Sequence, residues 1–339
     1  MAHKIALNFE DGITRIIDCE PGEFVTDAAF RQRVNIPMDC RDGVCGTCKC
    51  YCEQGNYDLE FYMDDSLTED EAANRLVLTC QMTVDSDCVV NIPTSSTACK
   101  AEIDAVPGKV DAVERLSDTS FSLKIKTEKP VSFLPGQYVN ISVPHTSESR
   151  SYSFASAPDS TESTFLIRNL SGGVMSSYLS DGFTIDDELT LAGPMGTFYL
   201  RPIERPQLWL AGGTGLAPFL SMLECIKPEQ LGHPIKLFYA VNRTADLVEL
   251  DRLEKLAAVI GKVEIITIVA DKDENHARQG YVTDHLSRND LYDGNVDVYL
   301  CGPPPMVDAV RKNFVDLDCT PANFYFEKFN PKEMKEEAA

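Results

Sequence analysis

The clearest chemical signal in the sequence is a group of four cysteines. Cys40, Cys45 and Cys48 are spaced C-x4-C-x2-C, and Cys80 adds a fourth thiolate further along the chain. This is the plant-type spacing for a [2Fe–2S] cluster. Two glycines inside the loop permit positive φ angles, so that backbone N–H groups can turn toward the cluster sulfurs. We therefore predict that these four cysteines bind a [2Fe–2S] cluster, a group that carries one electron at a time.

Other cysteines in the same region leave two alternatives open. A structural zinc site needs two close cysteine pairs, but Cys80 and Cys88 lie eight residues apart. Cys50 and Cys52 extend the cysteine run, and either could replace one of the predicted ligands. Residues two apart on a strand share one face, so we expect both to be small buried side chains instead.

A second set of residues has the chemistry to hold a flavin. The guanidinium of Arg150 can grip a pyrophosphate, and Tyr152 offers a flat ring and a hydroxyl. Ser153 can hydrogen-bond near flavin N5, where a hydride arrives. Arg168 is a further candidate, for which an exposed strand charge is an equally good interpretation. A glycine turn at the start of a helix can bind the phosphates of the cofactor through backbone N–H groups. The residues of this turn are Gly172, Gly173, Val174, Met175 and Ser176.

Two further turns suit a nicotinamide nucleotide. The first follows a strand-like run, and its glycines let a phosphate approach the backbone at the start of a helix. It is not G-x-G-x-x-G, so a purely structural turn is the alternative. The second contains a cysteine, for which a buried, inert thiol is the alternative. The residues are Gly212, Gly213, Thr214 and Gly215 in the first turn, and Cys301, Gly302, Pro303 and Met306 in the second.

Three segments must position these motifs. Residues 1–97 are acidic and cysteine-rich. Residues 103–204 contain many short β-branched runs divided by turn residues, which predicts an antiparallel β-barrel or sandwich. Residues 205–339 alternate strand-like and helical periods, which predicts an α/β domain with a parallel sheet. We therefore expect a multidomain protein with these three domains.

Local signals predict three features of the first segment. Apolar alternation around Asp11 and Gly12 predicts a β-hairpin. Thr68 and Glu71 predict a capping box that opens a helix running toward Leu78. The polar stretch Pro93–Thr97 is typical of a linker.

Charge narrows the class of partner. The net charge is −22, and residues 1–99 hold 18 acidic and 7 basic side chains, or −11. Such a field disfavours nucleic acid and anionic membranes and favours a positively charged protein patch, unless the acidity serves only solubility. The N-terminus has no apolar region typical of a signal peptide, and no run of 18 apolar residues occurs. We therefore expect a cytoplasmic location without a membrane span.

The motifs resemble two known families. Residues 35–88, including Cys-Arg-Asp-Gly-Val-Cys-Gly-Thr-Cys, resemble plant-type ferredoxins. The remaining segments resemble the ferredoxin–NADP reductase superfamily, whose signatures are R-x-Y-[ST], a following G-x-x-S, and C-G-P-x-x-M. The resemblance implies an α+β ferredoxin domain of the β-grasp type, FAD rather than FMN, and a position for Cys301 beside the nicotinamide.

The same resemblance assigns roles near the C-terminus and a cofactor preference. Members of the superfamily end with Glu-x-aromatic, and the aromatic ring covers the flavin until nicotinamide displaces it. Glu327 and Phe329 match that spacing, but ten residues follow Phe329, so a core position for this ring stays open. NADP-using members carry Ser-Arg after the third strand of this domain. Asp271 occupies that place here and suits a ribose diol, which predicts NADH, although Arg243 and Lys272 are nearby cations.

The order of the three segments resembles the reductases of bacterial two-component oxygenases, above all the benzoate 1,2-dioxygenase type. The resemblance implies an NADH-dependent iron–sulfur flavoprotein oxidoreductase. A hydride from NADH would reach FAD, and single electrons would leave through the cluster to a Rieske-type terminal oxygenase. That oxygenase would act on benzoate or a similar aromatic acid and dock on the acidic ferredoxin face. Reduction of a di-iron monooxygenase of the phenol or methane type, or a redox-sensing binding role, are the alternatives.

Overall fold

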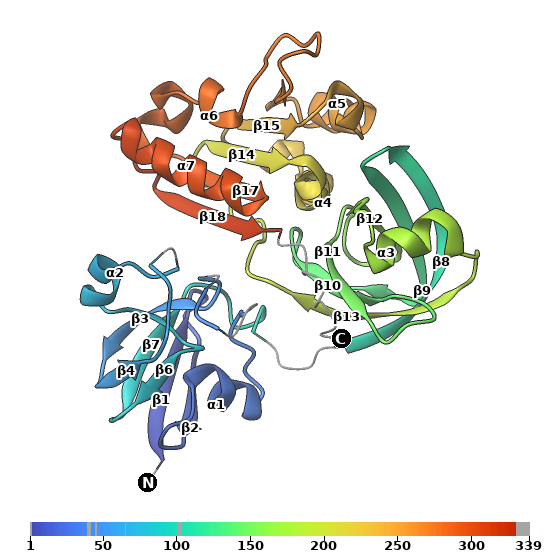
Figure 1. The fold of residues 1–339 in the computed structure, drawn as a ribbon. Helices are drawn as coiled ribbons and strands as arrows, with labels where there is room; N and C mark the ends of the chain where they lie inside the picture. The colour runs from blue at the N-terminus through green and yellow to red at the C-terminus, as the bar shows by residue number, and fades with distance from the viewer. Residues whose placement is uncertain (1, 39–41, 45, 65, 100–103, 330–339) are drawn as a thin grey trace, which may run out of the picture. The chain divides into compact units, whose positions relative to one another are not determined.

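The computed structural model describes residues 2–38, 42–44, 46–64, 66–99 and 104–329 (Figure 1). The chain divides into two compact units, one over Met1–Asp104 with Met195–Thr197 and the other over Ala105–Pro194 and Phe198–Ala339. No helix in the part of the chain described here is long and apolar enough to cross a membrane.

The first unit is an α+β fold of the β-grasp type. Its sheet has the order β2-β1-β7-β3-β5, in which β1 and β7 are parallel and the other pairs antiparallel, and β4 pairs with β6 separately. Helix α1 packs on β2 and β6 and buries its small side chains Ala28 and Ala29 in the apolar cluster of this unit. The bounds are β1 His3–Phe9, β2 Thr14–Cys19, α1 Val25–Arg31, β3 Lys49–Gln54, β4 Tyr57–Leu59, α2 Glu69–Ala73, β5 Leu76–Leu78, β6 Met82–Val84 and β7 Cys88–Ile92.

The predicted hairpin and capping box both form, but the predicted helix is shorter than expected. β1 and β2 pair around a turn in which Gly12 has a φ of 76°, and Thr68 and Glu71 make reciprocal capping bonds. Helix α2 ends at Ala73 and does not continue toward Leu78. Arg75 adopts a φ of 65°, and the apolar residues after it pair with β3 as β5. Pairing with a buried strand outweighs the helical pattern because it buries Leu78 completely.

The stretch Pro93–Thr97, predicted as a linker, is anchored to the first unit. The carbonyl of Thr94 accepts the backbone N–H of Glu10 at 3.0 Å. Ser96 donates both its backbone N–H and its hydroxyl to the carboxylate of Asp11, at 2.9 and 2.7 Å. The polar residues of this stretch therefore make long-range hydrogen bonds. Composition alone does not distinguish such an anchored segment from a free linker.

The first half of the second unit is the predicted β-barrel. Its six strands have the order β11-β10-β13-β8-β9-β12, and an antiparallel bridge between Phe154 and Phe165 joins the two ends. Apolar side chains of alternate strand residues fill the interior. The bounds are β8 Asp104–Ser117, β9 Ser120–Val131, β10 Tyr138–Ser142, β11 Ser149–Ser153, β12 Ser160–Arg168, α3 Val174–Ser177, the π-helical turn η1 Tyr178–Gly182 and β13 Glu188–Met195.

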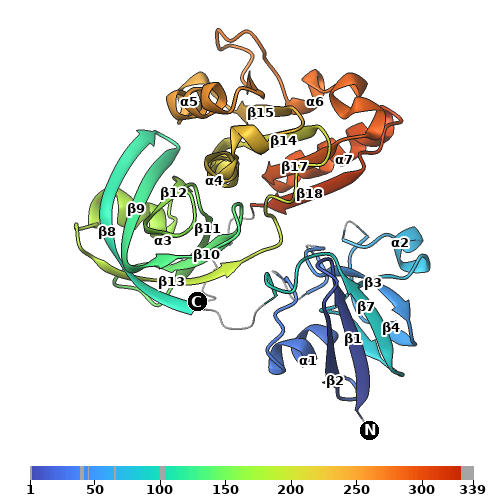
Figure 2. The same ribbon diagram turned by 180° about the vertical axis from the view of Figure 1, so that it is seen from behind.

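The second half is the predicted α/β fold. Its parallel sheet has the order β16-β15-β14-β17-β18, with α4 and α5 packed on one face and α6 and α7 on the other (Figures 1 and 2). The strand β18 extends this sheet beyond the strands that periodicity predicted. The bounds are β14 Gln207–Gly212, η2 Gly213–Leu216, α4 Ala217–Cys225, η3 Pro228–Gln230, β15 Ile235–Val241, η4 Thr244–Asp246, α5 Leu250–Ile260, β16 Val263–Val269, α6 Val282–His285, η5 Arg288–Gly294, β17 Asp297–Gly302, α7 Pro304–Asp316 and β18 Asn323–Lys328.

Candidate functional site

Two of the four predicted cluster ligands lie within the described residues. Cys48, just before β3, and Cys80, just after β5, are both buried and belong to one small apolar cluster. Their side chains are in hydrogen-bonding contact. Cys40 and Cys45 lie outside the described residues. Within those residues no group of three His, Cys, Asp or Glu side chains is placed to hold a metal ion, so the predicted set of four stays a prediction.

The surroundings of Cys80 fit a thiolate ligand. Hydrogen bonds to Cys80, of which the largest comes from the Cys48 thiol, lower the pKa of Cys80 to about 6, although burial opposes ionisation. The backbone N–H of Gly43 and the side-chain amide of Gln81 add to this effect. A buried thiolate beside a second cysteine and N–H donors is the environment that an iron–sulfur cluster requires.

The cluster loop depends on its two glycines. Gly43 and Gly46 have φ angles of 72° and 74°, which confirms the predicted left-handed conformation. A Cβ atom on Gly43 would lie 2.3 Å from the carbonyl oxygen of Phe61, so a side chain there would displace the backbone.

Cys50 and Cys52 belong to the core, as predicted. They share one face of β3 and are buried in the main apolar cluster of the first unit. The Cys52 thiol contacts that of Cys88 and accepts a hydrogen bond from Nη2 of Arg75 at 3.5 Å. Cys52 therefore contacts Cys88 and Arg75, and it belongs to a different apolar cluster from Cys48 and Cys80.

Strand β11 carries three predicted flavin ligands. Arg150 and Tyr152 are on one face, and Nη1 of Arg150 pairs with Oε2 of Glu148 at 2.6 Å. Burial raises the pKa of Tyr152, so its hydroxyl stays a hydrogen-bond donor. Ser153 is buried at the end of the strand. The flat, partly buried Tyr152 ring against the barrel wall fits a flavin.

The glycine turn that precedes α3 is shaped by Ser176. Its hydroxyl accepts the N–H of Leu170 at 2.8 Å and donates to the carbonyl of Arg168 at 3.3 Å, which closes the turn. Gly172 has a φ of 72°. Val174 and Met175 pack into or against the barrel core, so only their backbone groups remain to meet a phosphate. The guanidinium of Arg168 is exposed, as its alternative interpretation expected.

The two nucleotide turns come together at the carboxyl ends of adjacent strands. β14 and β17 are parallel neighbours, and a Cβ on Gly215 would lie 2.2 Å from the carbonyl oxygen of Cys301. A Cβ on Gly212 would lie 2.7 Å from the sulfur of Met306. Gly213 has a φ of 55° and open space where a Cβ would be. The carboxyl ends of β14 and β17 therefore leave room for a nucleotide phosphate to approach the backbone closely.

Three residues from separate motifs converge where the barrel meets this sheet. Ser153 on β11 donates its hydroxyl to Oε2 of Glu327 on β18 at 3.1 Å. Glu327 is the register partner of Cys301 on β17. Burial, and then the charge of Glu327, raise the pKa of the Cys301 thiol well above its usual value. Serine hydroxyl, neutral thiol and carboxylate thus share one location.

Phe329 and Asp271 follow the two edge strands of the nucleotide sheet, β18 and β16. The backbone N–H of Phe329 donates to the carbonyl of Gly302 at 2.9 Å, and its ring is partly buried against the apolar core beneath the sheet. Asp271 follows β16, is exposed, and donates its N–H to the carbonyl of Asn242 at 3.0 Å. Asp271 thus follows the third strand of this domain, as expected, and Phe329 follows the last strand. The contacts of both residues with cofactors stay predictions.

Residues that no motif marked hold the barrel to the nucleotide sheet. Arg252 on α5 donates to the carbonyl of Ala155, just past β11, and to Glu224 on α4 at 2.6 Å. Glu224 also accepts the N–H of Ala157 at 2.8 Å. These contacts fix β11, with Ser153, relative to the helices of the nucleotide half. Sequence patterns could not find them, because partners lie up to 97 residues apart.

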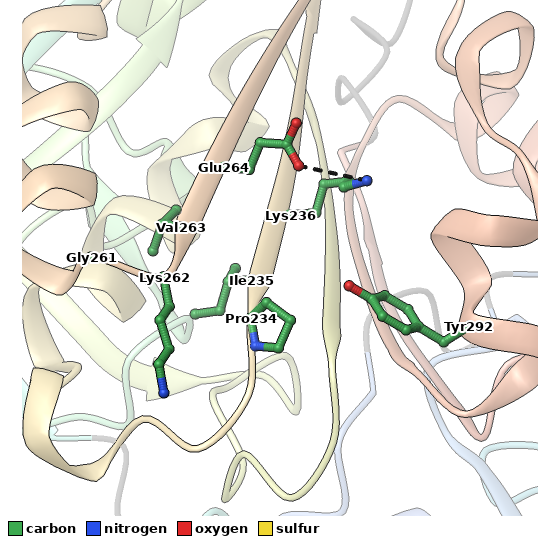
Figure 3. A pocket seen from close by; sticks show the side chains of 8 residues that line it. All are labelled: Pro234, Ile235, Lys236, Gly261, Lys262, Val263, Glu264 and Tyr292. Atoms are coloured by element: carbon green, nitrogen blue, oxygen red, sulfur yellow. Dashed lines mark ion pairs between the residues drawn. The ribbon is translucent and has the colours of Figure 1, made fainter.

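A pocket of about 300 Å³ lies elsewhere on the nucleotide half (Figure 3). It is lined by the first residues of β15 and β16, Ile235 and Val263, with Tyr292 opposite, and includes the ion pair of Lys236 and Glu264 at 3.6 Å. This is the amino end of the strands, whereas ligands of parallel sheets bind at the carboxyl ends. The pocket is therefore separate from the site described above.

Three family models match successive parts of the chain. The 2Fe-2S iron-sulfur cluster binding domain matches residues 8–85, the oxidoreductase FAD-binding domain residues 107–199, and the oxidoreductase NAD-binding domain residues 209–312. The matches place the cysteine, flavin and nucleotide motifs in domains of the corresponding kind, and they support [2Fe–2S], FAD and NAD as the cofactors.

Relatives cover almost the whole chain. The toluate 1,2-dioxygenase electron transfer component of Pseudomonas putida is 49% identical over 97% of this chain and 99% of its own length. The 2-halobenzoate 1,2-dioxygenase electron transfer component of Burkholderia cepacia is 48% identical over 98% and 99%. The propane 2-monooxygenase reductase component of Mycolicibacterium goodii is 33% identical over 96% and 97%. A solved ferredoxin reductase in carbazole 1,9a-dioxygenase has the same fold, with a TM-score of 0.64, 24% identity and coverage of 97% of this chain and 99% of its own.

Proposed function

Because this chain belongs to the family of iron–sulfur flavoprotein reductases that act as electron transfer components of oxygenases, we propose that it delivers electrons from NADH to a Rieske-type ring-hydroxylating dioxygenase acting on benzoate or a similar aromatic acid. One observation carries the catalytic part: the Ser153 hydroxyl of the barrel donates to Glu327 of the nucleotide sheet at 3.1 Å. The flavin and nucleotide motifs therefore serve one site.

The cofactors, when bound, supply hydride acceptance and one-electron transfer. The chain's own residues position them. Ser153 and Glu327 would present a hydroxyl and a carboxylate to the bound nicotinamide and flavin. Cys301 stays a neutral thiol, because its surroundings are apolar and Glu327 is negative. An uncharged, fully buried side chain at this point excludes water without repelling a hydride donor.

We assign the remaining predicted residues to cofactor binding as follows. Arg150 would hold the FAD pyrophosphate, and Tyr152 the flavin ring, with Ser176 shaping the turn whose backbone amides meet the phosphates. Phe329 would cover the flavin ring. Domain bounds of 1–97, 103–204 and 205–339 remain part of the proposal. The other residues assigned to FAD are Arg168, Gly172, Gly173, Val174 and Met175, and those assigned to NADH are Gly212, Gly213, Thr214, Gly215, Gly302, Pro303 and Met306.

We propose that Asp271 makes the enzyme prefer NADH to NADPH. An exposed carboxylate after β16 can accept hydrogen bonds from a ribose diol, and it repels a 2′-phosphate. Asp271→Ser is expected to raise the KM for NADH and lower that for NADPH, so that the preference narrows by about tenfold or more, a change of roughly 1.4 kcal/mol. Wild-type activity that is equal or greater with NADPH would overturn the assignment.

The partner proposal is favoured over a di-iron monooxygenase by the relatives. The two dioxygenase components are 49% and 48% identical, against 33% for the propane monooxygenase reductase. The test is reconstitution: the purified chain, NADH, O2, benzoate and the oxygenase component encoded beside it should form a dihydroxylated product. Negligible NADH oxidation with ferricyanide or cytochrome c would overturn the enzyme itself, and turnover only with a di-iron hydroxylase would overturn the partner.

A further inference from the structure

Arg201 stacks on two tyrosine rings in the segment that connects the barrel to the nucleotide sheet. Its guanidinium carbon, Cζ, lies 4.3 Å from the ring centre of Tyr199 and 4.0 Å from that of Tyr325 on β18. Nη1 of Arg201 also donates to the carbonyl of Tyr199 at 3.4 Å. The backbone N–H of Arg201 donates to the hydroxyl of Tyr299 on β17 at 3.2 Å. One residue of the connecting segment therefore contacts two neighbouring strands of the nucleotide sheet.

Arg201 contacts β18 on the face that carries Glu327. Tyr325 and Glu327 are two residues apart on this strand, so their side chains share one face. The packing agrees, since Tyr325 packs against the apolar core that contains Tyr299, whereas Phe326 packs against the core on the opposite face of the sheet. A residue that fixes the Tyr325 ring therefore also fixes the part of β18 from which Glu327 projects.

The same segment is attached to the barrel close to Ser153. The N–H of Leu200 donates to the carbonyl of Pro135 at 2.9 Å. Pro135 shortly precedes β10, whose first residue, Tyr138, is the register partner of Ser153. Leu200 is therefore fixed to the barrel near the strand pair that holds Ser153, and the next residue, Arg201, is fixed to the nucleotide sheet.

A guanidinium suits this position because it is planar. It can stack on aromatic faces while its N–H groups donate hydrogen bonds in the plane, which an ammonium group cannot do. Tyr199 and Tyr299 are buried and Arg201 is partly buried, so little water competes for these contacts. The hydrogen bond between Ser153 and Glu327 is 3.1 Å long, and it is lost if the two atoms move apart by about 0.5 Å. Their contact therefore requires β18 to be held firmly against the barrel.

We propose that Arg201 is a positioning residue for hydride transfer, which fixes β18 relative to the barrel and so keeps Glu327 within hydrogen-bonding reach of Ser153. This proposal rests on the proposed function and adds a residue that no sequence motif marked. Arg201 acts through Glu327 and is not assigned to the bound cofactors.

The test is a double-mutant cycle on the rate of flavin reduction at saturating NADH, measured with the holoenzyme by anaerobic stopped flow. Arg201→Leu should slow this rate by about twofold or more, up to the loss that Ser153→Ala causes. The Kd for NADH should stay at the wild-type value, because Arg201 does not hold the nucleotide. In the Ser153→Ala background, Arg201→Leu should cause little further slowing, since the contact that it positions is already absent.

Arg311→Leu is the matched control. Arg311 on α7 stacks on the ring of Phe326 with its Cζ 4.4 Å from the ring centre, so it makes the same kind of contact on the opposite face of β18. Arg311→Leu should reduce its flavin at the wild-type rate. Equal slowing by Arg201→Leu and Arg311→Leu would overturn the proposal, because general loosening of β18 would then explain both.

Two further results would overturn the proposal. One is an unchanged rate in Arg201→Leu, and the other is a double variant slowed by the product of the two single effects, since independent sites add their free energies. If Arg201→Leu loses FAD, Arg201→Lys decides by the same two results, because it keeps the charge and loses only the planar face. Failure of the wild-type chain to reduce its flavin with NADH would instead refute the proposed function.

Discussion

At the scale of single residues, the contact between Ser153 and Glu327 is the feature most directly open to test. Ser153→Ala removes a hydroxyl donor from the carboxylate at 3.1 Å. A net hydrogen bond contributes about 0.5–1.5 kcal/mol, so the rate of flavin reduction by NADH should fall by about 2- to 13-fold. Stopped-flow absorbance at the flavin band measures this rate directly.

The same strand offers a matched control. Ser151 is exposed and donates to Oδ1 of Asn140 at 2.6 Å, away from Glu327. Ser151→Ala should leave flavin reduction unchanged. Equal rates for the two variants would show that the Ser153 hydroxyl takes no part in hydride transfer.

Cys301 supports a prediction about pH. Burial, and then Glu327, raise the pKa of its thiol well above the usual value, which favours the neutral form. An ordinary thiol has a pKa of about 8.5 and is largely ionised at about pH 9. Because the pKa of Cys301 is raised, its thiol should stay protonated throughout the range from about pH 6 to about pH 9. Flavin reduction should therefore show no inflection from this group, and iodoacetamide should label it slowly even at the upper limit. An inflection that disappears in Cys301→Ala would contradict this.

At the scale of elements, the nucleotide edge depends on how closely η2 approaches β17. A Cβ on Gly215 would lie 2.2 Å from the carbonyl oxygen of Cys301, so Gly215→Ala must push η2 away from the strand. Overpacking of this kind costs about 1–3 kcal/mol. The Kd for NADH should rise by at least about fivefold, measured by titration of the oxidised enzyme with a non-reducing nucleotide analogue.

Gly232 provides the control for that change. A Cβ there would meet no atom within 4 Å. Gly232→Ala should bind the analogue as wild type does, and both variants should retain FAD and cluster absorbance. Loss of FAD from the Gly215 variant would show that the barrel, and not only the nucleotide edge, depends on this approach.

At the scale of the whole molecule, the net charge of −22 predicts opposite salt effects on two acceptors. Raising ionic strength from about 0.01 M to about 1 M shortens the Debye length from about 30 to about 3 Å. Electrostatic steering contributes about 10- to 1,000-fold to association, so turnover with basic cytochrome c should fall by at least tenfold. Turnover with ferricyanide, an anion, should not fall. Cytochrome c rates that are independent of salt would argue against an acidic docking face.

Much of this protein was predictable because its motifs are local. A cysteine spacing, two glycine turns and the alternation of strands and helices are each read within a short window, and they indicated three domains and their cofactors. Core positions on β3 followed from strand alternation, so Cys50 and Cys52 were assigned correctly. Glu327 was found through resemblance, since a single acidic residue near the C-terminus carries no signal of its own.

Only the tertiary structure decided which groups meet. Ser153 and Glu327 are 174 residues apart, and Arg252 reaches Ala155 across 97. The end of α2 was misjudged because β5 forms by pairing with β3, a contact that helical periodicity does not contain. The sequence by itself determined the kinds of chemistry and the folds of the segments, since spacing and periodicity are local. The meeting of hydroxyl, thiol and carboxylate required the folded chain, because strand order and domain packing are long-range properties.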